Sequence, residues 1–500
     1  MRLFRLMIVG CCFALLIPST VLALDTFFAS PRAMGMGGAN VVSVRDTSAQ
    51  YYNPAAFGFF AQRDAEGRRL AADNSDMGKK RWGVDIGVAG GYRLHGEFGD
   101  YIDDLSEINL DQLEAGIETE SDLQDLVKLV GALAGIDKAN TGVTADANAG
   151  FGVRMGRFGV GVRGYGQAAA WVAELDSTNL GFSIAVDDVN TQIGTIVIDG
   201  NDGEVSALST NQQMQLTVAG FSADAVQKLD YLIRTNGISA NDLQAAVDLL
   251  ETVATTSGTG SNLEDNTTTV VLTGFGVGEI PFTYGYAINN NIAVGGNIKL
   301  MQGRVYGNQV LVFDDDSGEL MSESTENYND STNFGIDLGV LARYNRFAFG
   351  LVGRNLNSPK FDGFTKEVVL SNGETSTVSA SDVRIDPQVT AGVAYFPWDT
   401  VTVEVNYDLT ENKTAFRNYK TQNLSLGLEW DALNFLALRG GIYKNMAESD
   451  VGLVYTAGLG LNLWAARLDV AGVFSEDKYT YDGDKIPQET RVAVALSVDF

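Results

Sequence analysis

The residue types that most often carry enzymatic chemistry are scarce in this chain. There is one histidine, His95, and the two cysteines, Cys11 and Cys12, lie side by side near the start of the sequence. No serine–histidine or paired-carboxylate arrangement stands out that would support nucleophilic or acid–base catalysis. A single imidazole also leaves no histidine cluster for a metal. We therefore predict no catalytic residue, no metal and no cofactor, and a protein that is not an enzyme.

Composition narrows the choice of function further. The 500 residues include 63 Asp and Glu against 35 Lys and Arg, a formal net charge of −28, and 45% are hydrophobic. A strongly negative protein is not expected to bind the phosphates of nucleic acid. Beyond residue 23 there is no run of about 18 apolar residues, so the sequence excludes membrane-spanning helices.

The first 23 residues have the pattern of an export signal. Two arginines precede an apolar run over residues 6–17, and Val21-Leu22-Ala23 offers a signal-peptidase site. We predict a signal peptide over residues 1–23, whose cleavage removes both cysteines. The alternative is lipid attachment at Cys11, because the residues before it loosely match a lipobox.

Further along the chain, the dominant pattern is alternation of apolar and polar residues. In residues 401–409, Val, Val, Val, Tyr and Leu alternate with Thr, Glu, Asn and Asp. Strands of soluble sandwiches average five or six residues, whereas these segments reach about nine or more, the length of a tilted membrane-spanning strand. Fourteen such segments are predicted: 84–94, 146–155, 158–171, 269–287, 292–306, 331–344, 347–356, 388–396, 401–409, 422–430, 435–443, 453–464, 467–475 and 490–500.

The gaps between these segments favour a membrane barrel over a sandwich. Six short gaps alternate with seven longer ones, as the tight turns and long outer loops of outer-membrane barrels do. We predict an all-β, transmembrane β-barrel of about 14 antiparallel strands over residues 83–500, in the outer membrane of a Gram-negative bacterium. Helical periodicity within two long gaps predicts helical insertions in the outer loops, at 95–145 and 172–268. Another strand assignment could add or remove one hairpin.

Placing the apolar faces toward lipid leaves both signs of charge inside the barrel. The residues expected to face inward are Asp85, Arg93, Arg154, Arg163, Lys299, Asp337, Arg343, Arg354, Glu404, Asp408, Glu429, Arg439 and Asp469. Aromatic residues beside the short gaps suit the headgroup layer of a membrane; they are Tyr344, Phe347, Phe396, Trp398, Trp430, Phe435 and Trp464.

Two single residues have a special place in this pattern. Pro281 falls inside the segment 269–287, where it deletes a ladder hydrogen bond, so the wall either kinks or parts there as a lateral opening, or the strand ends near Gly278. Phe500 ends the last strand. A terminal aromatic resembles the assembly signal that the barrel-assembly machinery reads in outer-membrane proteins.

A glycine-rich segment precedes the first strand. It runs from Ala29-Ser-Pro-Arg-Ala-Met-Gly-Met-Gly-Gly-Ala-Asn40 to Tyr51-Tyr-Asn-Pro-Ala55, and it is too short and too polar to fold alone. Its order of residues resembles the N-terminal hatch of the FadL-type outer-membrane hydrophobic-compound transporter superfamily, including PorV-like and TraF-like barrels. The matching positions are Gly35, Gly37, Gly38, Asp46, Asn53, Pro54 and Ala55. The two long insertions depart from the family pattern and leave the substrate open.

The resemblance implies that residues 24–82 form a plug inside the barrel. Asn53 would hold a turn through its side chain and Pro54 would fix its φ angle, while the glycines would allow positive φ or close approach to the wall. Whether these residues gate the barrel or only stabilise the plug stays open. The implied function is passive uptake of hydrophobic compounds such as long-chain fatty acids, with lateral release into outer-membrane lipid. The alternative is a scaffold or accessory of a secretion or conjugal-transfer apparatus.

Overall fold

The computed structural model describes most of the chain after the expected signal. The described residues are 27–61, 77–109, 112–113, 116–138, 140–177, 179, 186–198, 203–256, 266–311, 327–369, 375–417, 419–432, 435–448, 451–463 and 466–500. The predicted signal peptide and Trp464 lie outside these ranges.

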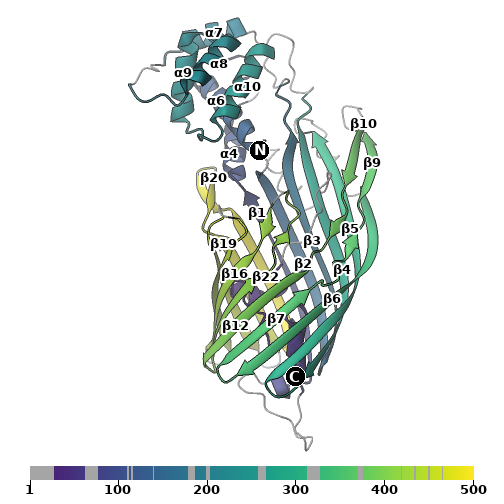
Figure 1. Cartoon of the computed structure of the whole chain (residues 1–500). Helices are drawn as coiled ribbons and strands as arrows, with labels where there is room; N and C mark the ends of the chain where they lie inside the picture. The colour runs from purple at the N-terminus through teal and green to yellow at the C-terminus, as the bar shows by residue number, and fades with distance from the viewer. Residues whose placement is uncertain are drawn as a thin grey trace, which may run out of the picture.

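Fourteen antiparallel strands close into a single barrel (Figure 1). Each strand pairs with its neighbour in the chain, and the last strand pairs with the first. The strands are β1 (Trp82–His95), β2 (Gly142–Met155), β3 (Phe158–Glu174), β4 (Thr269–Ala287), β5 (Ile292–Leu311), β6 (Tyr328–Tyr344), β7 (Phe347–Arg354), β12 (Gln388–Trp398), β13 (Val401–Asp408), β16 (Asn423–Ala432), β17 (Leu436–Asn445), β18 (Val454–Leu463), β19 (Ala466–Ser475) and β22 (Glu489–Asp499). The predicted strand count and fold class are confirmed.

The two faces of the barrel wall differ in the way that the alternation predicts. On β16, Leu424, Leu426 and Leu428 are 42–49% exposed on the outer face, while Ser425 and Glu429 at alternate positions are buried. Such an outer apolar band is what the hydrocarbon of a bilayer requires of a barrel. None of the described helices is long and apolar enough to span a membrane.

Most of the predicted aromatic residues lie at the end of the barrel with the short turns, on its outer face. Tyr344, Phe347, Trp398, Trp430 and Phe435 are all exposed. Phe396 differs, because its half-buried ring packs against an apolar cluster inside the barrel.

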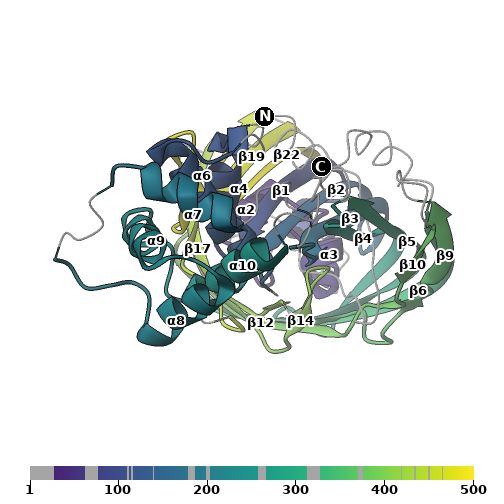
Figure 2. The same cartoon turned by 90° about the horizontal axis from the view of Figure 1, so that it is seen from above.

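Helices and hairpins fill the long connections at the other end. The first insertion contains α4 (Phe98–Glu107) and α6 (Glu120–Ile136), and the second contains α7 (Val186–Thr195), α8 (Thr210–Ala219), α9 (Ala223–Thr235) and α10 (Leu243–Thr256). α6 to α10 share one apolar core and stand over one side of the barrel mouth (Figure 2). We call α6 to α10 the helical cap.

Four two-stranded sheets among the described residues also lie outside the barrel ladder. They are β8 (Lys360–Phe361) with β11 (Val383–Arg384), β9 (Phe364–Val369) with β10 (Thr375–Ala380), β14 (Asn412–Lys413) with β15 (Lys420–Thr421), and β20 (Lys478–Tyr481) with β21 (Asp484–Pro487). The connection between β14 and β15 crosses the lumen to the opposite wall. There Phe416 stacks on His95 with ring centroids 4.1 Å apart, and the Ala415 amide donates to Gln167 Oε1 over 3.1 Å.

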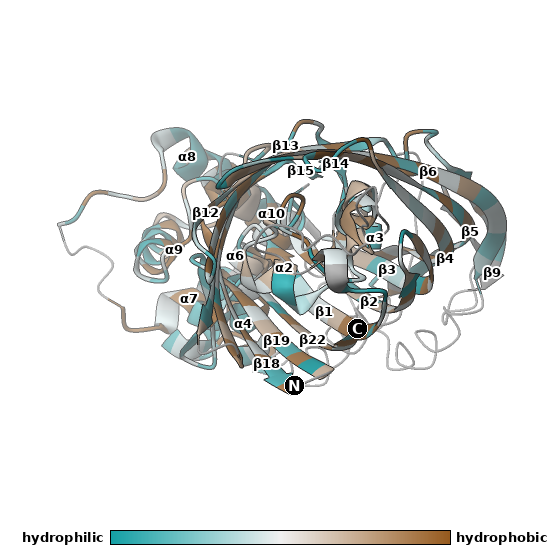
Figure 3. Ribbon diagram, turned by 90° about the horizontal axis from the view of Figure 1, so that it is seen from below, coloured by the Kyte–Doolittle hydropathy of each residue, from teal (hydrophilic) through white to brown (hydrophobic). Residues whose placement is uncertain are grey.

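The N-terminal segment lies inside the barrel, where Figure 3 shows α2 and α3 enclosed by the wall. It contains α2 (Pro31–Gly35), α3 (Ala49–Tyr52) and the 3₁₀ helices η1 (Pro54–Phe59) and η2 (Met77–Lys79). Wall glycines make room for it: a Cβ added to Gly285, Gly295, Gly339, Gly427, Gly441 or Gly458 would collide with atoms of this segment or approach them at about van der Waals contact. These glycines therefore shape the lumen around the segment's backbone.

Candidate functional site

The glycine motif lies against β16, β17 and β18. Gly37 and Gly38 have φ angles of +65° and +92°, which side chains rarely adopt. A Cβ on Gly37 would also lie 2.7 Å from the Ile442 carbonyl oxygen. The Gly37 amide donates to Thr456 Oγ1 over 2.9 Å, so the motif needs both the unusual φ and the close approach.

The Asn-Pro-Ala motif caps η1 and ties the segment to β6. Asn53 Oδ1 accepts a hydrogen bond from the Ala55 amide over 3.1 Å. Asn53 Nδ2 donates to the carbonyl oxygens of Val41 and Val340, each over 3.1 Å. Pro54 occupies the first turn of η1, where its missing N–H costs nothing. These contacts hold a turn, and a gating role for the motif stays a prediction.

Asp46 supports the adjacent helix α3. Its Oδ1 accepts hydrogen bonds from the amide and the hydroxyl of Ser48, the residue that precedes α3. The glycines of the motif thus lie against β16 to β18. Asn53 and Pro54 lead into η1, which faces β4 to β6, whereas Thr47, next to Asp46, lies against Gly83 of β1 and Gly152 of β2.

A network of buried charges centred on Glu429 anchors the N-terminal segment. Arg32 Nε and Nη2 donate to Oε2 and Oε1 of Glu429 over 2.9 and 2.8 Å. Arg439 Nε and Arg45 Nη2 also donate to Glu429, over 2.8 and 3.0 Å. Arg32 is 2% and Glu429 is 1% exposed. A forked pair this deeply buried fixes the orientation of both side chains.

A second buried carboxylate holds the backbone of the segment. The two oxygens of Glu404 accept hydrogen bonds from the amides of Val42 and Ser43, each over 2.9 Å. Of the thirteen charged residues predicted to face inward, eleven are buried and two, Asp85 and Arg343, are partly buried. The alternating pattern therefore predicted which charged residues face the lumen. It could not predict that they bind Arg32 or backbone amides of the N-terminal segment.

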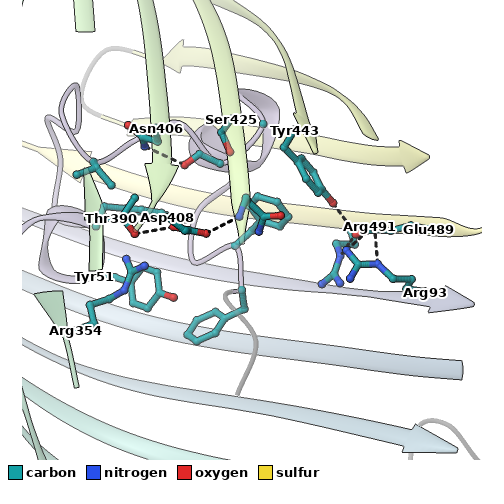
Figure 4. A pocket seen from close by; sticks show the side chains of 17 residues that line it. Tyr51, Arg93, Arg354, Thr390, Asn406, Asp408, Ser425, Tyr443, Glu489 and Arg491 are labelled. Carbon is teal, nitrogen blue, oxygen red and sulfur yellow. Dashed lines mark hydrogen bonds and ion pairs between the residues drawn. The ribbon is translucent and has the colours of Figure 1, made fainter. Parts of the chain in front are cut away.

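A cavity of about 70 Å³ lies between the N-terminal segment and the wall (Figure 4). The segment contributes Phe27, Phe28, Tyr51 and Tyr52, whereas the wall side is polar and charged. Glu489 on that side accepts hydrogen bonds from Tyr443 Oη over 2.6 Å, Arg93 Nε over 2.9 Å and Arg491 Nε over 2.7 Å. Sequence reasoning missed the aromatic side, since nothing local distinguishes Tyr51 or Phe27 from ordinary core residues.

Pro281 interrupts the hydrogen-bonded ladder without ending the strand. β4 runs on to Ala287, so the alternative in which the strand ends near Gly278 is wrong. The pairing of β3 with β4 skips from Val160–Phe282 to Arg163–Glu279 in an unchanged register. Gln50 Nε2 donates to the Pro281 carbonyl over 3.2 Å and to Thr283 Oγ1 over 2.7 Å. The N-terminal segment therefore covers the interruption from inside.

Phe500 completes the seam between the first and last strands. Its ring stacks on Trp82 with centroids 4.5 Å apart, and its amide donates to the Trp82 carbonyl over 2.8 Å. The contacts show a role in closing the barrel, and its part in assembly stays a prediction.

Three solved structures offer distant likenesses. The toluene transporter TodX of Pseudomonas putida is 10% identical with a TM-score of 0.45, over 96% of this chain and 99% of that one. The toluene transporter TbuX of Ralstonia pickettii is 11% identical with a TM-score of 0.43, over 95% and 99%. A FadL homologue of Pseudomonas aeruginosa is 10% identical with a TM-score of 0.44, over 96% and 99%. These likenesses are too distant to carry a conclusion about this chain.

Family membership rests on the sequence. No curated protein matches the chain. The family described as "F plasmid transfer operon, TraF, protein" matches residues 50–408, which begin in the N-terminal segment and extend through β13. The predicted resemblance to TraF-like barrels is thereby confirmed, and the chain belongs to the TraF protein family.

Proposed function

We propose that this chain is an outer-membrane barrel for the passive uptake of hydrophobic compounds, with the N-terminal segment as its plug. One observation carries the proposal: the aromatic cavity and the interrupted β3–β4 ladder adjoin the same stretch of the plug. Tyr51 lines the cavity, while the preceding residue, Gln50, covers Pro281. A small movement of α3 would connect the cavity with the interruption of the β3–β4 ladder.

The proposed route runs from the outer loops into the cavity and then sideways through the wall. A hydrophobic compound released into lipid never has to cross the aqueous periplasmic side. The outer surface beside the interruption is open, because Gly164 and Gly278 pair there and neither has an atom within 4 Å of where a Cβ would lie. Long-chain fatty acids belong to the class of compound that this route suits.

Locking the ladder at the interruption tests the lateral route. The register places Val162 opposite Ile280, so Val162→Cys with Ile280→Cys should form a disulfide across it. The matched control is Phe158→Cys with Tyr284→Cys, a pair on the same two strands nearer the short turns. Uptake of N-phenylnaphthylamine, an apolar dye, is followed by fluorescence in cells under oxidising and reducing conditions.

We expect oxidation to abolish dye uptake through the first variant and reduction to restore it, with the control active in both states. Full uptake by the oxidised first variant would refute release at Pro281. Absence of any uptake by the unmodified protein, relative to cells without it, would refute the transport function itself.

A second function, as an accessory of a conjugal-transfer or secretion apparatus, is favoured by the insertions. Residues 96–141 and 175–268 contain 25 acidic and 4 basic residues, a net charge of −21 out of −28 for the chain. The helical cap also has its own apolar core. Replacing residues 186–256 with a short linker should then abolish cross-linking to a surface partner while leaving dye uptake intact. An unchanged cross-linking pattern would count against the accessory function.

A further inference from the structure

One buried cation in the lumen has no counter-ion among the residues that the structure describes. Arg354, the last residue of β7, is 5% exposed and lines the cavity. Its Nε makes no hydrogen bond, and its guanidinium carbon lies 4.8 Å from the centre of the Tyr51 ring. Figure 4 shows Arg354 beside that ring. A buried charge without a partner is costly, so a site of this kind favours an anion.

The surrounding charges do not compensate Arg354. Arg163 lies over the same ring at 4.9 Å and is 3.9 Å from Glu279, which is also 3.6 Å from Lys299. Lys299 is in turn 3.0 Å from Asp337. This group of neighbours therefore has three cationic and two anionic side chains. Its excess is a single positive charge.

The remaining charged groups of the cavity are already engaged. Arg93 and Arg491 bind Glu489, and Arg491 also binds Asp146. Asp408 accepts hydrogen bonds from Thr390 Oγ1 over 2.8 Å and from the Asn423 amide over 3.1 Å. The donors to Asp408 are neutral, so its negative charge remains and counts against a highly charged ligand. A monoanion matches the single positive charge around Arg354 better than a dianion such as phosphate does.

The aromatic side of the cavity indicates the rest of the ligand. Phe27 stacks on Tyr165 with centroids 4.5 Å apart and lies 4.8 Å from Tyr51. A guanidinium binds a carboxylate through two parallel hydrogen bonds, and flat rings pack well on such aromatic faces. We propose that the cavity binds an aromatic monocarboxylate, with its carboxylate on Arg354 and its ring against Phe27 and Tyr51. This inference rests on the proposed uptake function and narrows its substrate class.

Calorimetric titration of the detergent-solubilised protein tests the assignment. The probes are benzoate, which has the carboxylate, and toluene, which has the same ring without charge. Arg354→Met removes the cation. Arg304→Met is the matched control, because Arg304 also lies over a tyrosine, Tyr328, at 3.8 Å but sits on the outer face paired with Asp330.

We expect benzoate to bind the unmodified protein and the Arg304→Met control equally, and Arg354→Met about tenfold or more weakly. Toluene binding should not change. Arg354→Lys keeps the positive charge but cannot form two parallel hydrogen bonds, so its affinity for benzoate should be intermediate. It replaces Arg354→Met in the test if heat modifiability shows that Arg354→Met does not fold. Equal benzoate affinity in all variants, or no benzoate binding at all, would overturn the proposal.

Dye uptake and benzoate binding test the transport function and the carboxylate site independently. Dye uptake together with absent benzoate binding would leave the transport function standing and refute only the carboxylate site. Benzoate binding that depends on Arg354 in a protein without dye uptake would establish the site and refute the transport function.

Discussion

Buried charges, in addition to apolar contacts, fix the N-terminal segment within the lumen. Glu429 lies at the centre, with Arg32 from the segment and Arg439 from the neighbouring strand both within 2.9 Å. Because the members of such a group satisfy one another's hydrogen bonds, losing one leaves donors or acceptors of the others unmatched. The segment therefore resists displacement more strongly than its short helices alone would suggest.

Removing Arg32 should loosen the segment while the wall survives. Arg32→Met removes one arginine from Glu429, which keeps Arg45 and Arg439, so the cost should fall below the about 3–5 kcal/mol of breaking an isolated buried pair. We expect larger and more frequent current steps in planar bilayers than the unmodified protein gives. The Arg304→Met variant, which removes an exposed ion pair, should behave as the unmodified protein does. Indistinguishable conductance in all three would show that this pair does not retain the segment.

The glycine motif allows a test of backbone strain with a control nearby. Gly37→Ala forces a side chain into a positive φ and against the Ile442 carbonyl, so it should destabilise the protein by about 1–3 kcal/mol. Gly440→Ala on β17 has no atom within 4 Å of the added Cβ and should be nearly neutral. Thermal unfolding measures both. Equal melting temperatures would contradict the tight packing of the motif.

The position of a residue could be predicted from the sequence where a single local pattern determined it. The inward charges followed from alternation, and the turn at Asn53 followed from the resemblance. Arg32 and Gln50 could not be found in this way, because their partners Glu429 and Pro281 lie more than two hundred residues away in sequence. Arg354 was predicted to face inward. That it has no counter-ion among the described residues could be seen only from the contacts of all the side chains around it in the lumen.

At the scale of elements, long periodic strands were predictable and short ones were not. Each barrel strand contains several alternating positions, whereas β8, β11, β14 and β15 have two residues each and hence no period. α6 has a capping box, with Thr119 and Asp122 each bonding the other's backbone amide, and a long apolar stripe. α8 has no such stripe, because Leu216 is its only buried residue among those described.

The helical insertions should respond to pH through Asp104 on α4. Burial raises the pKa of Asp104 to about 6, and nearby acidic residues add to this while Lys128 opposes it. An unfolded aspartate titrates near 3.9, so the folded state binds the proton more tightly and loses stability as pH rises from about 4 to about 6.

Asp104→Asn removes that titration. We expect helix melting, followed by circular dichroism, to shift upward on the order of 1–2 °C at pH 7 and to change little at pH 4, since the residue is only half-buried. Glu118→Gln, at an exposed position of the same insertion, is the control. A lower melting temperature for Asp104→Asn at pH 7 would show that the carboxylate stabilises the fold.

For the whole molecule, the sequence predicted the barrel and its two insertions because membrane barrels separate short turns from long loops so regularly. It could not predict that one insertion would build most of a helical cap with a separate core, since its helices are short and contact one another across distant parts of the chain. Nor could it predict how completely the N-terminal segment occupies the lumen.

Deleting residues 27–79 tests the plug at this scale. The deletion should leave a polar channel lined by buried wall charges, and the negative charge of the protein should favour cations. We expect large cation-selective conductance from the deletion variant and almost none from the full mature chain, with folding of both checked by heat modifiability. Equal conductance from the two proteins would mean that the segment does not close the barrel.

The glycines of the inner wall also bear on the order in which the molecule can form. Side-chain-free positions on β4, β5, β6, β16, β17 and β18 fit the backbone of the N-terminal segment over much of the circumference. A finished cylinder offers no route by which a segment so closely enclosed could slide in. The N-terminal segment should therefore be in place before β22 pairs with β1. It would then act as a template around which the later strands close.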